Sequence, residues 1–297
     1  MNQSSHKYPP LHGLIGLILV LVFWSLNWSL EGLRTHWGFF PIWLGYCLTI
    51  DALVYYRKRT SLLKRNAKLY LILFIISIPC WWLFEFFNLY TENWFYDGRQ
   101  YFTSTEYILL SSLSFSTVMP AILGTAELAG TFNWIKRIKS IKEITPTKKI
   151  LYSTFLAGIL IIYLIFSLPG YFYPFVWLSV FLITEPINFW LKNPSIFRYT
   201  AVGDWKPVIA FAVGGLICGF FWDMWNYFSY PKWIYNLPLF NFLKVFEMPI
   251  LGYIGYIPFS LEIFSLYHLV TGFFKSTVSL NYIQIEAAEI KIDMDYS

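Results

Sequence analysis

Long apolar runs alternate with short polar segments along the whole chain. A helix needs ~20 predominantly apolar residues, within a range of about 17–25, to cross the hydrocarbon core of a bilayer. Eight runs meet this requirement, at 13–30, 38–56, 69–90, 108–130, 149–168, 171–191, 207–227 and 250–273. The pattern predicts an all-α fold, a polytopic membrane bundle of about eight transmembrane helices. Because the first run lacks a small-residue cleavage site, we expect it to be retained as a helix.

The composition excludes an ordinary soluble protein. Apolar residues make up 57% of the 297 residues and charged residues only 13%, whereas soluble domains carry about 25% charged residues. The net charge of +5 is spread over the loops and does not predict nucleic-acid binding. The sequence contains neither a glycine-rich nucleotide-binding motif nor zinc-ligand spacing, so we expect no cofactor and no metal.

Basic residues cluster in alternate loops. If the N-terminus is cytoplasmic, the segments on that side are 1–12, 57–68, 131–148, 192–206 and the tail from 274. They hold 18 of the 22 lysines and arginines, counting Lys149 at a loop edge. The basic residues left for the outer side are Arg34, Arg99, Lys232 and Lys244. The positive-inside rule therefore predicts a multi-pass protein of the cell (cytoplasmic or inner) membrane with both termini in the cytoplasm.

The two halves of the chain resemble each other at an offset of about 134–138 residues. In both halves a Trp, an acid and an Asn are followed by Trp-x-Tyr. The matched residues are Trp82, Glu85, Asn88, Trp94 and Tyr96 in one half and Trp222, Asp223, Asn226, Trp233 and Tyr235 in the other. This similarity predicts a 4+4 tandem parallel repeat, with four-helix units at 1–135 and 136–275 and a loose polar cytoplasmic tail at 276–297. We expect a shared site between the halves, although aromatic-rich helices can also look alike by chance.

Acidic residues lie inside six of the predicted spans, and no lysine or arginine lies well inside any. These acids are Asp51, Glu85, Glu127, Glu185, Asp223 and Glu262. Ionisable residues within a membrane cost about 2.5–3.5 kcal/mol each on insertion scales and by default mark function. Without basic partners, these acids are expected to be protonated, to bind a cation, or to face a cation formed during a reaction.

The acids fall into layers. Asp51 and Glu185 lie near the cytoplasmic ends of their spans, whereas Glu85 and Asp223 lie near the outer ends. Three of the acids are followed three positions later by an asparagine, at Asn88, Asn188 and Asn226. This spacing places acid and amide on one helix face, so we expect the amides to donate hydrogen bonds to the carboxylates. The alternative is that they form polar contacts between helices.

The most specific local pattern lies in the second half. It runs Trp222-Asp223-Met-Trp225-Asn226, then Trp233-Ile-Tyr235, then Gly252 and Pro258-Phe-Ser-Leu-Glu262. Over about 50 residues this pattern resembles the integral-membrane lycopene cyclases of bacteria and fungi, in which a polar residue and a Trp-x-Tyr-like stretch precede a Gly and a Pro-x-Glu-Glu motif. Here a single glutamate follows the proline by four positions, and each repeat has four predicted spans where that family has about three.

The resemblance implies an isoprenoid or carotenoid substrate and a proton-initiated, non-redox cyclisation by membrane carboxylates. The candidate catalytic residues are then Asp223, Glu262 and Glu85. The candidate substrate-binding residues are Trp82, Asn88, Trp222, Trp225, Asn226, Trp233, Asp51 and Glu185. The composition suits this chemistry, because apolar burial keeps an acid neutral until it acts and a desolvated aromatic face stabilises a cation by about 2 kcal/mol.

Two other classes of protein fit the same pattern. Proton- or cation-coupled transporters also combine repeats with carboxylates near the middle of the membrane. A non-catalytic membrane scaffold would use the acids for stability alone. All three hypotheses share the lipid bilayer as a partner.

Overall fold

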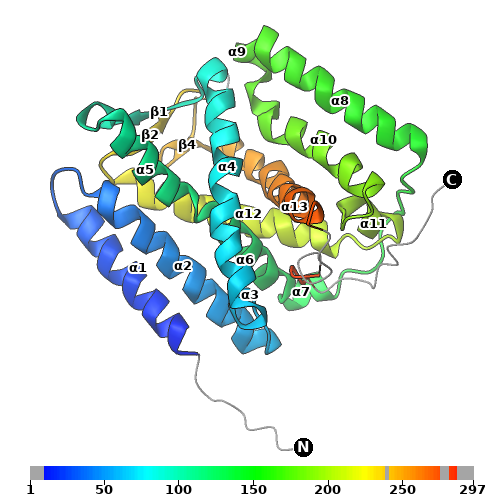
Figure 1. The fold of residues 1–297 in the computed structure, drawn as a ribbon, viewed down its shortest axis with the longest axis horizontal. Coiled ribbons are helices and arrows are strands. Elements are labelled where there is room, and N and C mark those ends of the chain that lie inside the picture. Colours follow the sequence, from blue (N-terminus) through cyan, green and yellow to red (C-terminus); the bar gives the residue numbers. More distant parts are fainter. Residues whose placement is uncertain (1–9, 238–240, 275–280, 286–297) are drawn as a thin grey trace, which may run out of the picture.

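The computed structural model describes residues 10–237, 241–274 and 281–285, arranged as Figure 1 shows. Eight helical segments are long and apolar enough to cross a membrane, which confirms the all-α polytopic bundle. In the first half they are α1 (Leu11–Ser29), α2 (Thr35–Lys58), α4 (Ala67–Thr91) and the pair α5 (Ser104–Phe115) and α6 (Val118–Gly130). In the second half they are α8 (Lys148–Ser167), α9 with η2 and α10 (Pro169–Phe172, Tyr173–Phe175, Val176–Trp190), α12 (Lys206–Tyr227), and η3 with α13 (Ile250–Gly255, Tyr256–Gly272).

Short elements lie in the loops at both ends of the bundle. The short helices are α3 (Leu62–Arg65), η1 (Arg99–Tyr101), α7 (Asn133–Lys136) and α11 (Ile196–Ala201). The strands are β1 (Trp94–Asp97), β2 (Lys232–Tyr235), β3 (Lys244–Val245) and β4 (Met248–Pro249), which form two antiparallel pairs, β1–β2 and β3–β4. The apolar pattern predicts none of these elements, because each is too short to show a period. We call the end with α3, α7 and α11 the basic end, and the end with the two strand pairs the aromatic end.

Corresponding helices of the two halves have corresponding neighbours. In the first half α1 packs on α2, and α6 packs on α2 and α4; in the second half α8 packs on α10, and α13 packs on α10 and α12. Figure 1 shows the α1–α2 and α8–α10 pairs on opposite sides of the molecule, and α12 packs on α6 between them. This arrangement is what a tandem repeat would produce, but the duplication and its boundaries stay predictions.

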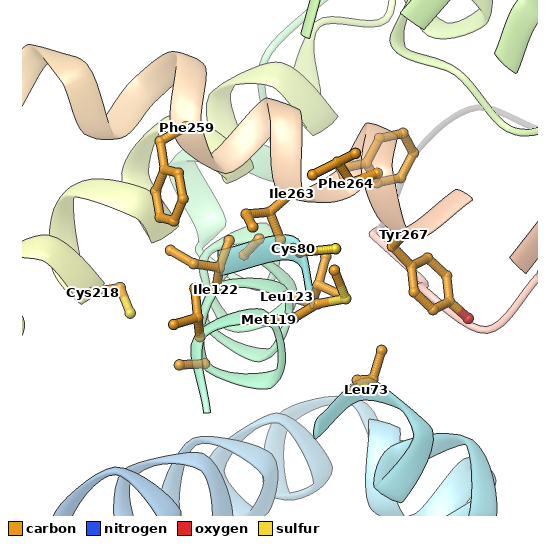
Figure 2. Close-up of a cluster of buried hydrophobic side chains, with 14 of the residues drawn as sticks. Leu73, Cys80, Met119, Ile122, Leu123, Cys218, Phe259, Ile263, Phe264 and Tyr267 are labelled. Atoms are coloured by element: carbon orange, nitrogen blue, oxygen red, sulfur yellow. The ribbon is translucent and has the colours of Figure 1, made fainter. Parts of the chain in front are cut away.

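The core between the halves is apolar and tightly packed. Figure 2 shows side chains from α4, α6, α12 and α13 meeting there. Those with almost no exposed surface include Leu73, Met119, Ile122, Leu123, Cys218 and Ile263. All three cysteines of the chain are free and buried.

Three of the eight spans are interrupted, the fourth at its middle and the sixth and eighth at the aromatic end. The fourth breaks between α5 and α6, the sixth begins as α9 and η2, and the eighth begins as η3. Ser77 of α4 supplies hydrogen bonds to the backbone groups on both sides of the break in the fourth span. Its hydroxyl donates to the carbonyl of Phe115 (2.6 Å) and accepts from the amide of Met119 (3.0 Å). Irregular backbone at membrane depth is tolerated only where protein or a cavity meets its hydrogen bonds.

Two of the buried acids hold the short helices of the basic end. The carboxylate of Asp51 accepts from the Ser61 hydroxyl (2.7 Å) and the Leu63 amide (2.9 Å), at the start of α3. In the second half, Glu185 accepts from the Phe197 amide (2.9 Å) at the start of α11. An acid at a helix N-terminus meets backbone donors that have no partner within the helix. Both acids therefore anchor loops.

The expectation that no acid has a basic partner is wrong for Glu127. Arg65 reaches in from α3 and binds both of its carboxylate oxygens, the closer contact being 2.8 Å, and Lys58 Nζ lies 3.8 Å away. His12 Nε2 similarly lies 3.1 Å from Asp51. These basic side chains belong to loops or helix ends, and their length lets them reach a buried acid.

The expectation of a loose tail is wrong for residues 281–285, while most of 276–297 lies outside the described residues. Tyr282 is 2% exposed, and its hydroxyl donates to the carbonyl of Leu62 (2.7 Å). The amide of Gln284 donates to Glu127 (2.7 Å). This segment therefore closes the basic end of the bundle.

We predict that Arg65→Ala lowers the free energy of unfolding by about 3 kcal/mol, measured by reversible denaturation in detergent. Removing one partner of a buried ion pair leaves an uncompensated charge and costs about 3–5 kcal/mol, and Lys58 remains to offset part of it. Lys64→Ala, at an exposed position on the same helix, is the control and should cost less than about 0.5 kcal/mol. Equal losses in the two variants would contradict the role of the Arg65–Glu127 pair.

Candidate functional site

A cavity of about 560 Å³ opens at the aromatic end. Its walls come from the first turns of α2, Trp81 in the middle of α4, the end of α12, the β1–β2 ribbon and the interrupted segments of the fourth, sixth and eighth spans. Aromatic rings dominate its lining, among them Trp81, Trp94, Trp177, Trp222, Trp233 and Phe259. Small-molecule sites typically occupy ~300–1,000 Å³ and are mostly apolar with a few polar groups, so the cavity has the size and character of a ligand site.

The rings of both halves form one continuous wall. Trp94 stacks on Trp177 at 6.2 Å between centroids and an interplanar angle of 12°. Trp81 lies 6.1 Å from Trp177 and 6.0 Å from Trp222. Offset aromatic pairs at 4.5–7 Å contribute about 0.5–1.5 kcal/mol each beyond the area they bury. The packing therefore gives the cavity a stable wall that joins the two halves.

The β1–β2 ribbon is built from the two Trp-x-Tyr sequences. In its antiparallel register Trp94 pairs with Tyr235, and Tyr96 pairs with Trp233. Side chains alternate between the faces of a strand, so the Trp and Tyr of each strand share one face. All four line the cavity, whereas Phe95, between them, is 53% exposed.

The two asparagines fasten this ribbon to the helices. The Asn88 amide donates to the carbonyl of Trp94 (2.8 Å), and its oxygen accepts from the Trp94 amide (3.2 Å). Asn226 makes the same two hydrogen bonds to Trp233: it donates to the Trp233 carbonyl (2.7 Å) and accepts from the Trp233 amide (3.0 Å). The expectation that these amides donate to carboxylates is wrong at both positions. The third, Asn188, donates to Ser265.

Glu85 lies behind the aromatic wall and accepts hydrogen bonds from the N–H and O–H groups of the wall residues. One carboxylate oxygen, Oε1, accepts from Trp81 Nε1 (3.1 Å), Trp94 Nε1 (3.2 Å) and the Tyr96 hydroxyl (2.6 Å). Burial raises the pKa of Tyr96 well above its usual value, and the nearby Glu85 raises it further, so the phenol stays a donor at physiological pH. Three donors on one oxygen stabilise a carboxylate.

Asp223 lies behind the opposite part of the wall with fewer partners. Its Oδ2 accepts from the Tyr256 hydroxyl (3.0 Å), which lies 3.5 Å from the Tyr235 hydroxyl, and its Oδ1 has no hydrogen-bond partner among the described residues. Gly219, one turn earlier on α12, lets the Tyr256 ring approach, because a Cβ there would lie 2.3 Å from that ring. Burial, with a smaller contribution from Asp223, raises the pKa of Tyr235 well above its usual value.

Glu262 lies beneath the floor of the cavity. It follows Phe259 by three residues on α13, which places it about 4.5 Å further along the helix at 1.5 Å per residue. Its side chain is fully buried, and neither carboxylate oxygen has a hydrogen-bond partner among the described residues. An uncompensated carboxylate is very costly in apolar surroundings, so the neutral acid is the form that fits this position.

The structure brings together only part of the residue set expected from the sequence. Trp222 and Trp233 line the cavity. Trp82 does not, and its indole donates to Ser112 (2.9 Å). Trp225 is buried in the core, with its ring 5.1 Å from that of Trp43.

Asp51 and Glu185 lie away from the cavity. Asp51 follows the cavity residue Phe39 by twelve positions on α2, about 18 Å at 1.5 Å per residue. Glu185 follows Trp177 by eight positions on α10, about 12 Å. Their loop contacts at the basic end account for both acids without a ligand.

Six aromatic residues at the centre of the site were not among the candidate site residues predicted from the sequence. These are Trp81, Trp94, Trp177, Tyr96, Tyr235 and Tyr256, all of which line the cavity. The Trp-x-Tyr repeat contains three of them and signals a ribbon, because alternate residues share a strand face. The approach of Tyr256 to Gly219 belongs to the Gly215-x-x-x-Gly219 pattern, which indicates close helix packing.

No family model, no curated protein and no solved structure matches this chain. Within the described residues, no group of three His, Cys, Asp or Glu side chains is placed to hold a metal ion. The site must therefore be interpreted from its own geometry.

We predict that Asn226→Ala lowers the free energy of unfolding by about 1–3 kcal/mol, because it leaves the amide and carbonyl of Trp233 without their side-chain partner. Denaturation in detergent measures the loss. Asn236→Ala is the matched control, since that exposed side chain makes one long bond to Glu92 (3.3 Å) and should cost less than about 0.5 kcal/mol. If the two variants are equally stable, Asn226 does not hold the ribbon.

Proposed function

We propose that this integral membrane protein is an enzyme that binds an apolar isoprenoid in the aromatic cavity and cyclises it by proton transfer, without net redox change. One observation carries the proposal: two carboxyl groups, half-buried Glu85 and fully buried Asp223, are hydrogen-bonded by the aromatic residues that line the cavity. A substrate in the cavity would contact rings that are themselves coupled to acids. The resemblance of 222–264 to the integral-membrane lycopene cyclases favours the same chemistry.

The lining suits a carbocation. Aromatic faces attract a cation by about 2 kcal/mol or more each when desolvated, and the cavity offers the rings of Trp81, Trp177 and Trp222. Exclusion of water prevents a reactive intermediate from being quenched. Such surroundings stabilise the intermediate of a polyene cyclisation.

The different environments of the two acids support different roles for them in the proposed reaction. With Asp223 protonated, the hydrogen bond between the two side chains reverses, so that Asp223 donates to the Tyr256 oxygen and the Tyr256 hydroxyl turns to the substrate. Asp223 then gives its proton to the Tyr256 oxygen as the Tyr256 hydroxyl proton passes to a terminal double bond of the substrate. The resulting carbocation is attacked by a second double bond, which closes the ring. A neighbouring carbon then loses a proton to the Tyr96 oxygen, whose own proton passes to the Glu85 carboxylate. One proton enters and one leaves, so the product is an isomer of the substrate, and proton exchange with the solvent resets the acids.

Glu262 is the second candidate acid. It has no hydrogen-bond partner among the described residues and lies one helical turn beneath Phe259 in the cavity floor. A neutral carboxylic acid there is positioned to resupply protons or to donate directly to a substrate that reaches past the ring. Pairs of acids held in unequal environments are the usual way in which a protein separates proton donors from acceptors.

The size of the cavity sets the length of chain that can enter. A volume of 560 Å³ is typical of sites for drug-sized ligands. It would hold a short isoprenoid or one end of a long polyene, the remainder of which would extend into the bilayer. The proposed location is the cell (cytoplasmic or inner) membrane, with the cavity toward its outer face.

We predict that membranes of lycopene-accumulating cells expressing the protein contain a product of unchanged mass with a shorter conjugated system, detected by chromatography with absorbance and mass detection. Asp223→Asn should lower its formation by about 10²–10⁴-fold, because it removes the acid, and Glu262→Gln tests the second acid in the same assay. Glu31→Gln, in an exposed loop, is the control and should retain full activity per folded protein. Absence of any isomerised product with the wild-type chain would contradict the cyclase hypothesis for this substrate, and full activity of Asp223→Asn would contradict the assigned acid.

A proton-coupled carrier is the second candidate, favoured by the three spans interrupted at the cavity. Discontinuous helices commonly form the substrate sites of transporters. Flux measurements with reconstituted vesicles separate the two functions. A carrier moves a solute in response to a pH gradient and leaves it chemically unchanged, whereas an enzyme alters its substrate without any gradient.

A further inference from the structure

The cavity that we propose as the substrate site has a basic rim on its loop side. Three of its lining residues, His36, Arg99 and Lys232, can carry positive charge. Lys232 already has a counter-charge, because its ammonium group pairs with Glu247. The other two lie close together, since the ring of Phe102 packs on His36 and its carbonyl accepts a hydrogen bond from Arg99.

Arg99 has no acidic partner in the part of the chain that the structure describes. Its Nη1 donates to the carbonyl of Phe102 (2.8 Å), and its guanidinium lies over the ring of Tyr107, 4.1 Å from the centroid. Among the described residues, no carboxylate lies within 4.0 Å of it. A guanidinium has five N–H donors. Within the described residues, the hydrogen bond from Nη1 to Phe102 uses one of its three nitrogens.

The contacts of Arg99 hold it in one orientation at the edge of an apolar chamber. Stacking on Tyr107 and the bond to Phe102 limit its rotation. Arginine in a fixed, partly desolvated position binds carboxylate and phosphate groups through two parallel hydrogen bonds. A cation that lines a cavity without a counter-charge attracts an anionic group from outside the protein, which neutralises it.

We propose that the ligand of this cavity is amphipathic, with an anionic carboxylate or phosphate head group bound by Arg99 at the rim and an apolar chain against the aromatic wall. This inference rests on the proposed function and narrows its substrate class: the natural substrate is an isoprenoid with an anionic head group, and a hydrocarbon such as lycopene would occupy only the apolar part of the same cavity. The apolar chain reaches Trp81 and Tyr256, which hydrogen-bond to Glu85 and Asp223, while the head group stays at the rim. The head group thus sets which part of the chain meets the acids.

The test is equilibrium binding of two probes with the same C15 chain, farnesol and farnesyl phosphate, to the purified full-length protein in phosphatidylcholine nanodiscs, followed by tryptophan fluorescence. We expect the phosphate to bind about tenfold more tightly than the alcohol or better, since a hydrogen bond to a charged group supplies at least that factor. Arg99→Gln should remove this preference and leave farnesol binding within about twofold. Arg99→Lys should retain part of it, and Lys244→Gln, an exposed basic residue of the same end, should retain all of it.

Each outcome separates this inference from the proposed function. Equal affinities for the two probes, unaffected by Arg99→Gln, would overturn the head-group assignment and leave an apolar site intact. Failure of both probes to bind the wild-type chain would count against the isoprenoid site itself. Loss of both probes in Arg99→Lys and Arg99→Gln alike would mean that Arg99 supports the loop only, which also overturns the assignment. Adding phosphatidylglycerol to the nanodiscs identifies the source of the anion that Arg99 binds. If this anionic lipid competes with farnesyl phosphate, the site binds the head group of a bilayer lipid. If it does not compete, the site binds the head group of a free isoprenoid anion.

Discussion

A carboxyl group inside a membrane must obtain its hydrogen bonds from the protein, because the hydrocarbon core offers none. This constraint explains much of the structure. At the basic end, Asp51 and Glu185 accept hydrogen bonds from backbone amides at the start of two short helices. Glu127 forms an ion pair with Arg65, which belongs to one of those helices. The loops there are folded because buried acids need their donors.

At the aromatic end the same requirement is met by side chains of the cavity wall. Indole and phenol groups can present a donor to an acid while their rings face an apolar space. Glu85 uses two tryptophans and a tyrosine in this way, and Asp223 uses a tyrosine. Asn88 and Asn226 hold the ribbon that carries several of these rings. The chemistry of the cavity and its stability therefore depend on the same hydrogen bonds.

The spans could be predicted from the sequence because the bilayer imposes a length on each apolar helix, and the eight helices lie within a few residues of the predicted bounds. The residues of the candidate site were harder to predict from the sequence. Spacing of three residues correctly placed Glu85 and Asn88 near one helix face, but it does not reveal that Asn88 turns to the backbone of a strand six residues later. Trp81 and Trp82 are adjacent tryptophans, and only the packing of α4 decides that Trp81 faces the cavity. Glu127 looked unpaired because the reach of Arg65 depends on how a loop folds back.

Among the acids of the described residues, the unmet hydrogen bonds are found near the cavity. A scaffold would be expected to satisfy every carboxyl group as it satisfies Asp51, since an unpaired buried polar group costs about 1–3 kcal/mol. The described residues include two departures, Asp223 with one oxygen unbonded and Glu262 with both unbonded. Both lie directly behind residues that line the cavity, Tyr256 and Phe259. The proposed role in proton transfer would account for two acids that lie incompletely bonded near the ligand-sized cavity, while the acids of the basic end are bonded by loops.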